Sequence, residues 1–179
     1  RVALRNIYEG DGSWLHQAGL QALDAVDIVE LYAGGGYTPR PGVVYPETWF
    51  GDNLKTIAQF AKLGLGLRIA TLDLGGWDHH ENEDAVYGTL VDELARGLQA
   101  LWADLAAGLT DHTQRLTVVV MSEFGRRFAE NADAGTDHGH GNNMLVLSGN
   151  AIGGLHGSWP GLATLDDGRL YMVMEHLEG

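Results

Sequence analysis

Residues 67–121 run Leu67-Arg-Ile-Ala-Thr-Leu72, then a long amphipathic segment, then Leu116-Thr-Val-Val-Val-Met121. Both outer stretches are short and apolar, which is typical of buried strands. The segment between them carries an apolar stripe at helical spacing, made of Leu90, Leu94, Leu98, Leu101 and Leu105. A strand, a helix and a strand in succession predict a β-α-β unit, in which the two strands are parallel and helices cover the sheet.

The long helix has recognisable end signals. Asn82 is suited to cap its first turn, where Glu83 and Asp84 place negative charge that the helix dipole favours. Gly108 is suited to end it, because glycine readily takes the left-handed conformation that follows many helices. The helix is therefore expected over residues 82–108.

The rest of the chain predicts two further helices and one further strand. Apolar residues recur at helical spacing over residues 13–31 and 52–63, and Gly64 is a suitable stop for the second of these helices. Residues 37–50 contain three prolines and predict an extended connection. The apolar run 144–147 predicts a third strand. The whole chain of 179 residues is therefore expected to form a single α/β domain with a mostly parallel sheet sandwiched by helices.

Composition limits the partners of the chain. The net charge of −13 argues against nucleic acid and against anionic membrane surfaces, both of which require clustered lysine and arginine. The absence of cysteine excludes disulfides, zinc–thiolate sites and cysteine nucleophiles. No apolar run reaches the roughly 20 residues of a membrane span, and no signal peptide is recognisable. We therefore expect no nucleic acid partner and no membrane span, and the oligomeric state stays open.

Two glycine-rich segments hold most of the chemistry: Asp73-Leu-Gly-Gly-Trp-Asp-His-His80 and Thr136-Asp-His-Gly-His-Gly141. Mixed imidazole and carboxylate side chains suit zinc and other first-row divalent ions. The first segment follows a predicted strand, and ligand sites in α/β folds lie beyond the carboxyl ends of strands. The second lies in a patternless stretch of about twenty residues, a length usual for functional loops. We predict a divalent-metal site, with zinc as the first choice and manganese, calcium or magnesium as alternatives.

Seven side chains form the predicted ligand set: Asp73, Asp78, His80, Glu123, Asp137, His138 and His140. Of the neighbours His79 and His80 only one is expected to bind, because adjacent side chains diverge, and His80 is favoured. In extended backbone, His138 and His140 face the same side. Asp137 is either a ligand or a partner that fixes a histidine tautomer. The alternative is that both segments are polar loops without metal.

A third polar cluster, residues 123–127, follows the second predicted strand. Glu123 is open to three roles: metal ligand, general base, or ion-pair partner of Arg126 or Arg127. The two arginines are candidates for an anion clamp, because guanidinium matches the geometry of phosphate and sulfate. A structural Glu–Arg ion pair is an equal alternative. Arg126 is therefore the candidate catalytic residue, and the nucleophile is unknown.

Three ordered motifs resemble the family named "domain of unknown function fifteen-oh-one": Asp73-Leu-Gly-Gly-Trp-Asp-His-His80, Val118-Val-Val-Met-Ser-Glu-Phe-Gly-Arg126 and Gly135-Thr-Asp-His-Gly-His-Gly141. The resemblance covers about residues 40–165. That family looks like a branch of the alkaline phosphatase and sulfatase superfamily, and its members are typically exported, often with twin-arginine signals. The resemblance implies an alkaline phosphatase-like fold, a periplasmic or otherwise exported location, and a metal centre that acts on small phosphate or sulfate esters.

The resemblance also implies roles for single residues. Asp73 with His80, and His138 or His140, stand at metal-ligand positions of the superfamily. Glu123 stands where the superfamily has an Asp-His pair, and nothing in residues 1–40 matches its nucleophile strand. The chain is therefore expected to lack the N-terminal part of the family. Three alternatives follow: a metal-dependent hydrolase-like domain, a non-catalytic, metal-stabilised binding or structural domain, or a fragment whose active site is completed by another chain or by a further segment.

Overall fold

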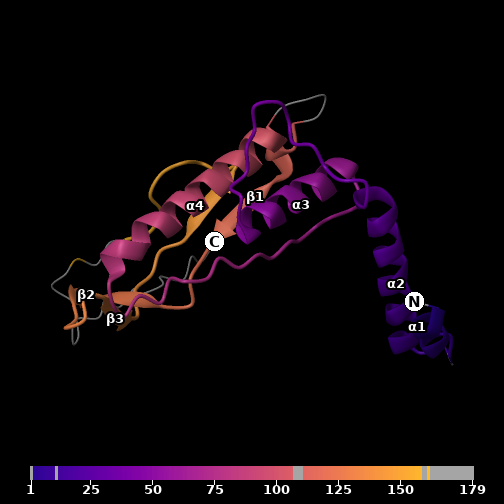
Figure 1. Ribbon diagram of the computed structural model, residues 1–179, viewed down its shortest axis with the longest axis horizontal. Coiled ribbons are helices and arrows are strands. Elements are labelled where there is room, and N and C mark those ends of the chain that lie inside the picture. Colours follow the sequence, from indigo (N-terminus) through magenta and orange to yellow (C-terminus); the bar gives the residue numbers. More distant parts are fainter. Residues whose placement is uncertain (1, 11, 107–110, 159–160, 162–179) are drawn as a thin grey trace.

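The computed structural model describes residues 2–10, 12–106, 111–158 and 161 (Figure 1). Its helices are α1 (Val2–Tyr8), α2 (Trp14–Ala33), α3 (Trp49–Leu63) and α4 (Glu83–Leu105), with a short 3-10 turn, η1 (Thr113–Arg115). Its strands are β1 (Thr117–Val120), β2 (Gly125–Glu130), β3 (Thr136–Gly139) and β4 (Leu145–Ser148). Within these residues, no helix has both the length and the apolar character that a membrane crossing requires.

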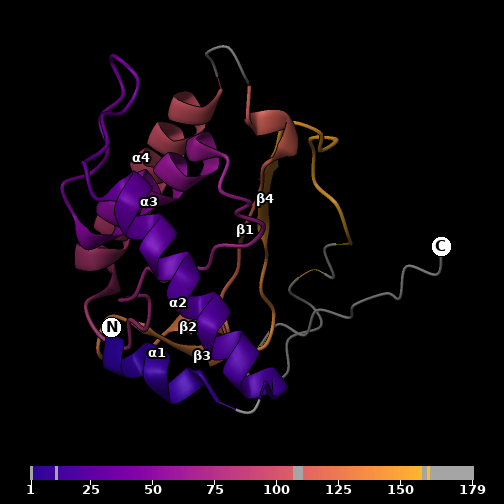
Figure 2. The ribbon, with the colours of Figure 1, turned by 90° about the vertical axis from the view of Figure 1, so that its right-hand side faces the viewer.

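The strands form two separate antiparallel pairs. In one, β1 pairs with β4, so that Thr117 lies opposite Ser148 and Val120 opposite Leu145. In the other, β2 pairs with β3 as a hairpin whose register shifts after Arg126. Figure 2 shows α3 and α4 on one side of the β1–β4 pair. The β2–β3 hairpin lies at the N-terminal end of α4 (Figure 1).

The core lies between α3, α4 and the extended segment that precedes α3. Its buried members are Tyr45, Phe50, Leu54, Ala58, Ala100, Leu101 and Leu105. Leu94, from the middle of the predicted leucine stripe, and Leu116 and Val118, from beside and within β1, pack against this cluster. The stripe is thus the core-facing side of α4, as its spacing predicts.

A buried carboxylate connects the three parts of this core. Asp104 of α4 is fully buried and accepts hydrogen bonds from Lys62 Nζ at 2.6 Å, Tyr37 Oη at 2.7 Å, the Arg40 backbone N–H at 2.8 Å and Tyr45 Oη at 2.9 Å. Burial opposes ionisation of Asp104, but these donors, led by Lys62, hold its pKa below the usual range. A buried charge is tolerated when it is paired and hydrogen-bonded, and the four donors around Asp104 meet this condition.

The predicted helices are confirmed, with small changes at their ends. Ser13 caps α2 by accepting a hydrogen bond from the His16 backbone N–H, and Gly64 ends α3 with a φ of 65°. Asn82 makes no side-chain cap to α4; its φ is 49°, and its backbone N–H binds the Asp133 carbonyl oxygen instead. The predicted stop at Gly108 lies outside the described residues.

The predicted strand at residues 67–72 is wrong. This segment is extended but pairs with no described strand, and Ile69 is 83% exposed. An apolar run becomes a strand only when a neighbouring backbone offers it hydrogen bonds. The mostly parallel sheet is corrected for the same reason, because both described strand pairs are antiparallel.

The other two strand predictions are confirmed in place but not in burial. The predicted strand at 116–121 is β1, and that at 144–147 is β4. Val119 is 44% exposed and Met121 is 69% exposed, so only one face of β1 contacts the core. The patternless stretch after β1 contains the β2–β3 hairpin, whose short polar strands lack the alternation that reveals strands in a sequence.

We expect Asp104→Asn to destabilise the protein by about 3 kcal/mol at neutral pH, because Lys62 loses its charged partner. The folded pKa of Asp104 is below its unfolded value, so its contribution is complete above a pH of about 4 and is lost as pH falls through the folded pKa. Urea unfolding followed by circular dichroism at several pH values should show the difference from wild type shrinking in acid.

The matched control is Asp92→Asn on the same helix, where an exposed carboxylate pairs with the exposed side chain of Arg96 at 3.0 Å. Exposed pairs of this kind contribute about 0.5 kcal/mol or less. Equal stability of the Asp104→Asn and Asp92→Asn variants would contradict the role given to Asp104.

Candidate metal centre

Three side chains from two distant segments point their donor atoms at one another. Asp78 and His80 lie in the turn before α4, and His138 lies on β3. His138 Nε2 is 2.6 Å from Asp78 Oδ1, His80 Nε2 is 3.0 Å from the same oxygen, and the two Nε2 atoms are 3.3 Å apart. The predicted meeting of these two glycine-rich segments is confirmed.

Backbone hydrogen bonds hold the hairpin against the turn. The Thr136 N–H donates to the His79 carbonyl oxygen at 3.0 Å, and the Glu83 N–H donates to the Ala134 carbonyl oxygen at 2.8 Å. Asn131 adds a side-chain donor, with Nδ2 2.8 Å from the His80 carbonyl oxygen. These bonds place β3, which carries His138, beside His80.

Gly135 is required by this close approach. A Cβ atom at this position would lie 2.2 Å from the carbonyl carbon of His80 and 2.4 Å from its oxygen. Real Cβ contacts are not that short, and both atoms belong to the backbone, so a larger residue forces the turn and the hairpin apart.

Arg126 of β2 connects the turn before α4 with β3. Its guanidinium donates to the carbonyl oxygens of Trp77 and Thr136, and at 3.4 Å to that of His79. Its Nη2 is also 3.5 Å from Asp78 Oδ1. Because the guanidinium donates to backbone carbonyl oxygens, it stabilises the turn. This position does not favour the anion clamp expected from the sequence.

Asp137 lies behind His80. Its Oδ1 is 3.2 Å from His80 Nδ1 and accepts a hydrogen bond from Asn131 Nδ2 at 3.3 Å. A carboxylate only accepts, so this contact places a proton on Nδ1 and, in neutral imidazole, leaves the lone pair of Nε2 facing Asp78 and His138. The hydrogen bond from Asn131, and then that from His80, hold the pKa of Asp137 below its usual range.

Phe124 and Asp78 orient the ring of His138. The rings of Phe124 and His138 are stacked, with centroids 3.9 Å apart and planes 11° apart. The hydrogen bond from His138, and then the charges of His80, His138 and Arg126, hold the pKa of Asp78 below its usual range. Asp78 is therefore ionised, as a metal ligand must be.

The neighbouring histidine faces away from the donor atoms. His79 is 6% exposed, and its ring lies 6.3 Å from that of Tyr87 and 6.4 Å from that of Trp77. Its Nε2 is buried and makes no hydrogen bond in the structure. The divergence of His79 and His80 is the arrangement expected of adjacent side chains.

The structure does not gather the whole predicted ligand set. Among the described residues, three side chains bring a carboxylate or imidazole ligand atom within 4.8 Å of one another, namely Asp78, His80 and His138. The other predicted ligands, Asp73, Glu123, Asp137 and His140, are outside this group. His140 follows the last residue of β3, so the same-side rule for extended backbone does not reach it.

The sequence analysis did not predict the roles of Asn131 and Glu83 at this site. Asn131 binds both Asp137 and the His80 carbonyl oxygen, and Thr136 Oγ1 donates to Glu83 Oε2 at 2.7 Å. In the sequence, Glu83 is explained by its place in the first turn of the helix, and an asparagine in a loop has no single expected role. Only the register of the hairpin against α4 reveals these contacts.

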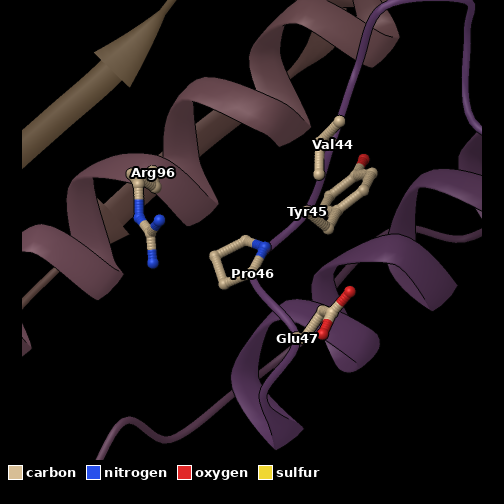
Figure 3. Close-up of a pocket in the computed structure, with 5 residues that line it drawn as sticks. All are labelled: Val44, Tyr45, Pro46, Glu47 and Arg96. Atoms are coloured by element: carbon tan, nitrogen blue, oxygen red, sulfur yellow. The ribbon is translucent and has the colours of Figure 1, made fainter.

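The three donor side chains lie at the surface. Asp78 is 58% exposed, and His80 and His138 are each 47% exposed. A hollow of about 480 Å³ lies elsewhere, between residues 44–47 and Arg96 of α4 (Figure 3). A smaller hollow of about 260 Å³ lies between α4 and the hairpin and is lined partly by Glu83, Tyr87 and Phe128. Neither hollow is lined by the donor residues.

The donor set and its spacing fit a first-row divalent ion. Two imidazole nitrogens and one carboxylate oxygen suit zinc and its neighbours better than calcium or magnesium, which prefer oxygen. A tetrahedral ion with bonds of ~2.1 Å keeps its ligand atoms about 3.4 Å apart. The observed separations of 2.6, 3.0 and 3.3 Å need only a slight outward movement to reach that value.

The fold and the site define a small α/β protein with a candidate metal centre. Residues 46–171 match the family described as "Protein of unknown function (DUF1501)", and the chain belongs to that family. The predicted family is thereby confirmed. The match includes α3, α4, all four described strands and the three donor residues, whereas α1 and α2 lie outside it. No curated protein and no solved structure is significantly similar to the chain.

We expect Gly135→Ala to destabilise the protein by about 2 kcal/mol, because its Cβ overlaps the backbone of His80. Gly153→Ala is the matched control, since a Cβ there meets nothing within 4 Å. Both substitutions restrict the unfolded chain equally, so thermal unfolding of the pair isolates the clash. A Gly135→Ala protein as stable as the control would show that the hairpin does not approach the turn this closely.

Proposed function

We propose that the chain binds a divalent transition-metal ion through Asp78, His80 and His138 and serves as a metal-dependent hydrolase of phosphate or sulfate esters. The observation that carries this proposal is the convergence of three ligand atoms within 4.8 Å from residues 58 and 60 positions apart. The tertiary fold, and not the proximity of these residues in the sequence, brings their ligand atoms together.

The number and exposure of the donors favour a reactive ion over a closed structural one. Three protein donors leave at least one coordination position for water or substrate, as in catalytic zinc sites. A divalent ion in such a site polarises an ester oxygen and lowers the pKa of a bound water. Because each donor side chain is about half exposed, a small ester reaches the site from solvent.

The nearby side chains supply positioning. Asp137 orients His80, Phe124 stacks on His138, and Arg126 braces the turn that carries Asp78. The hydroxyls of Thr136 and Ser122 are committed elsewhere, since Thr136 donates to Glu83 and Ser122 donates to the Phe124 carbonyl oxygen at 3.0 Å. This arrangement favours direct attack by water over a covalent intermediate.

The ester class rests on the resemblance of the three motifs to the alkaline phosphatase and sulfatase superfamily. Membership of the DUF1501 family supports the motif assignment, and the superfamily link is part of our proposal. Anionic phosphate and sulfate esters also suit a cationic centre in a chain of net charge −13, which otherwise repels them.

A second candidate function is a non-catalytic domain that a metal ion stabilises. The position of the ligands favours it, because an ion bound to Asp78, His80 and His138 ties the hairpin to the start of α4. The donor residues line neither of the two hollows described above, which also fits this function. Turnover by the metal-loaded protein separates the two candidates.

Metal content tests the site directly. We expect about one zinc or similar ion per chain in protein purified without a metal column, measured by plasma mass spectrometry. His80→Ala and His138→Ala should each lower that content at least tenfold, because either change leaves two ligands. His156→Ala is the control, since His156 Nε2 binds the backbone oxygen of Ile152 at 2.9 Å and His156 is outside the ligand group of the described residues.

Equal metal content in the wild type and the two ligand variants would refute the site. Metal-loaded wild type should then hydrolyse a generic aryl phosphate or aryl sulfate, and chelation should abolish that turnover. Stoichiometric metal without turnover on either ester supports the non-catalytic candidate.

The role of Asp137 has its own test. We expect Asp137→Asn to weaken zinc affinity by about 10–100-fold, because the amide no longer holds the proton on His80 Nδ1 as a carboxylate does. The ion should still bind at saturating zinc, since the three ligands remain. Competition with a chromophoric chelator measures the affinity, and an unchanged value would assign Asp137 to folding alone.

A further inference from the structure

The N-terminal helices leave one side of α2 uncovered. α1 packs on the opposite side, where Arg5 pairs with Asp24 at 2.8 Å and with Asp27 at 2.5 Å. The ring of Tyr8 lies against Gly19, at one border of the uncovered side. Figure 1 shows α1 and α2 projecting from the end of the molecule away from β2 and β3.

The uncovered side carries the repeat of a coiled-coil seam. Six residues follow one another at alternating steps of three and four, namely Leu15, Ala18, Ala22, Ala25, Val29 and Tyr32. All six are exposed, including Leu15 at 55% and Tyr32 at 55%. Apolar residues at this spacing are the pattern with which one helix packs along another. We call these six residues the α2 seam.

The α2 seam and its borders are free of charge. The positions that flank a seam in a coiled coil are occupied by Trp14, Gly19, Gln21, Val26 and Ile28. The acidic residues of the helix, Asp24, Asp27 and Glu30, all lie off the seam. An uncharged stripe along an exposed helix is unusual in a chain of net charge −13.

We propose that the α2 seam binds the α2 seam of a second copy, antiparallel, about a two-fold axis near the middle of the helix. This arrangement sets Leu15 opposite Tyr32 of the second copy and Ala18 opposite Val29. The alanines at 22 and 25 meet at the centre. Large residues thus cover the ends while small ones allow close approach in the middle, so the surface is complementary to itself.

Charge and area favour a second copy as the occupant. Two chains of net charge −13 repel at most orientations, but contact through an uncharged seam brings no carboxylates together. Trp14 is 80% exposed and Tyr32 is 55% exposed. Aromatic side chains bury about 150–250 Å² each, so two copies carry a large part of the roughly 1,200 Å² that a specific interface needs.

Sedimentation equilibrium of the full chain tests the association. We expect the wild type to approach twice its chain mass of 19.3 kDa at micromolar concentration. Ala25→Glu should weaken the dimer at least tenfold, because the two-fold axis sets the new carboxylates side by side. Glutamate keeps a helix propensity close to that of alanine, so α2 stays folded, which circular dichroism verifies.

Leu31→Glu is the matched control. Leu31 is 74% exposed and lies on α2 but off the seam, so the same added charge should leave the dimer intact. A monomeric wild type overturns the proposal. A dimer that withstands Ala25→Glu as well as it withstands Leu31→Glu overturns it too.

Disulfide trapping tests the orientation, because the chain has no cysteine of its own. A mixture of Ala18→Cys and Val29→Cys chains should cross-link under mild oxidation, since antiparallel packing sets these positions opposite each other. Neither variant alone should do so efficiently. Preferential cross-linking of Ala18→Cys to itself would overturn the antiparallel arrangement.

Discussion

The Arg126 guanidinium and the hydrogen bonds around it dock the β2–β3 hairpin on the turn that precedes α4. One side chain binds carbonyl oxygens 47 and 49 positions away in sequence and another on the neighbouring strand. The hairpin is short and polar and has little apolar surface with which to hold itself in place. Its position therefore depends on satisfied backbone groups, and Gly135 makes the necessary approach sterically possible. The candidate metal centre exists only while this docking holds.

The α3–α4 core stabilises α4, the helix at whose N-terminal end the hairpin docks. The α3–α4 core, with Asp104 bound by four donors, anchors the C-terminal half of α4, and α4 begins where the hairpin attaches. The carboxylates around the centre are divided in role. Asp78 faces the two histidine Nε2 atoms, whereas Asp137 stands behind His80. Such a division is typical of metal sites in which outer partners set the orientation of the ligands.

Charge is distributed unevenly over the chain. Residues 73–105, which include α4 and the turn before it, hold eight acidic residues and one arginine, and a bound divalent cation offsets part of this charge, while the α2 seam carries none. The two proposals use these surfaces separately. The metal centre lies within the part of the chain that matches the DUF1501 family, and α2 lies outside it. A change in one function therefore need not affect the other.

Local sequence patterns by themselves predicted the helices, the core-facing leucine stripe, and the places of β1 and β4. They also predicted that His80, and not His79, is the candidate metal ligand. Each of these depends on spacing along one segment or on the divergence of adjacent side chains. Only the tertiary structure decided that residues 67–72 stay unpaired, that the strand pairs are antiparallel, and that Arg126 braces the turn. The physical reason is that strand pairing and backbone capping join groups far apart in sequence, so the partner, and not the segment, determines the outcome.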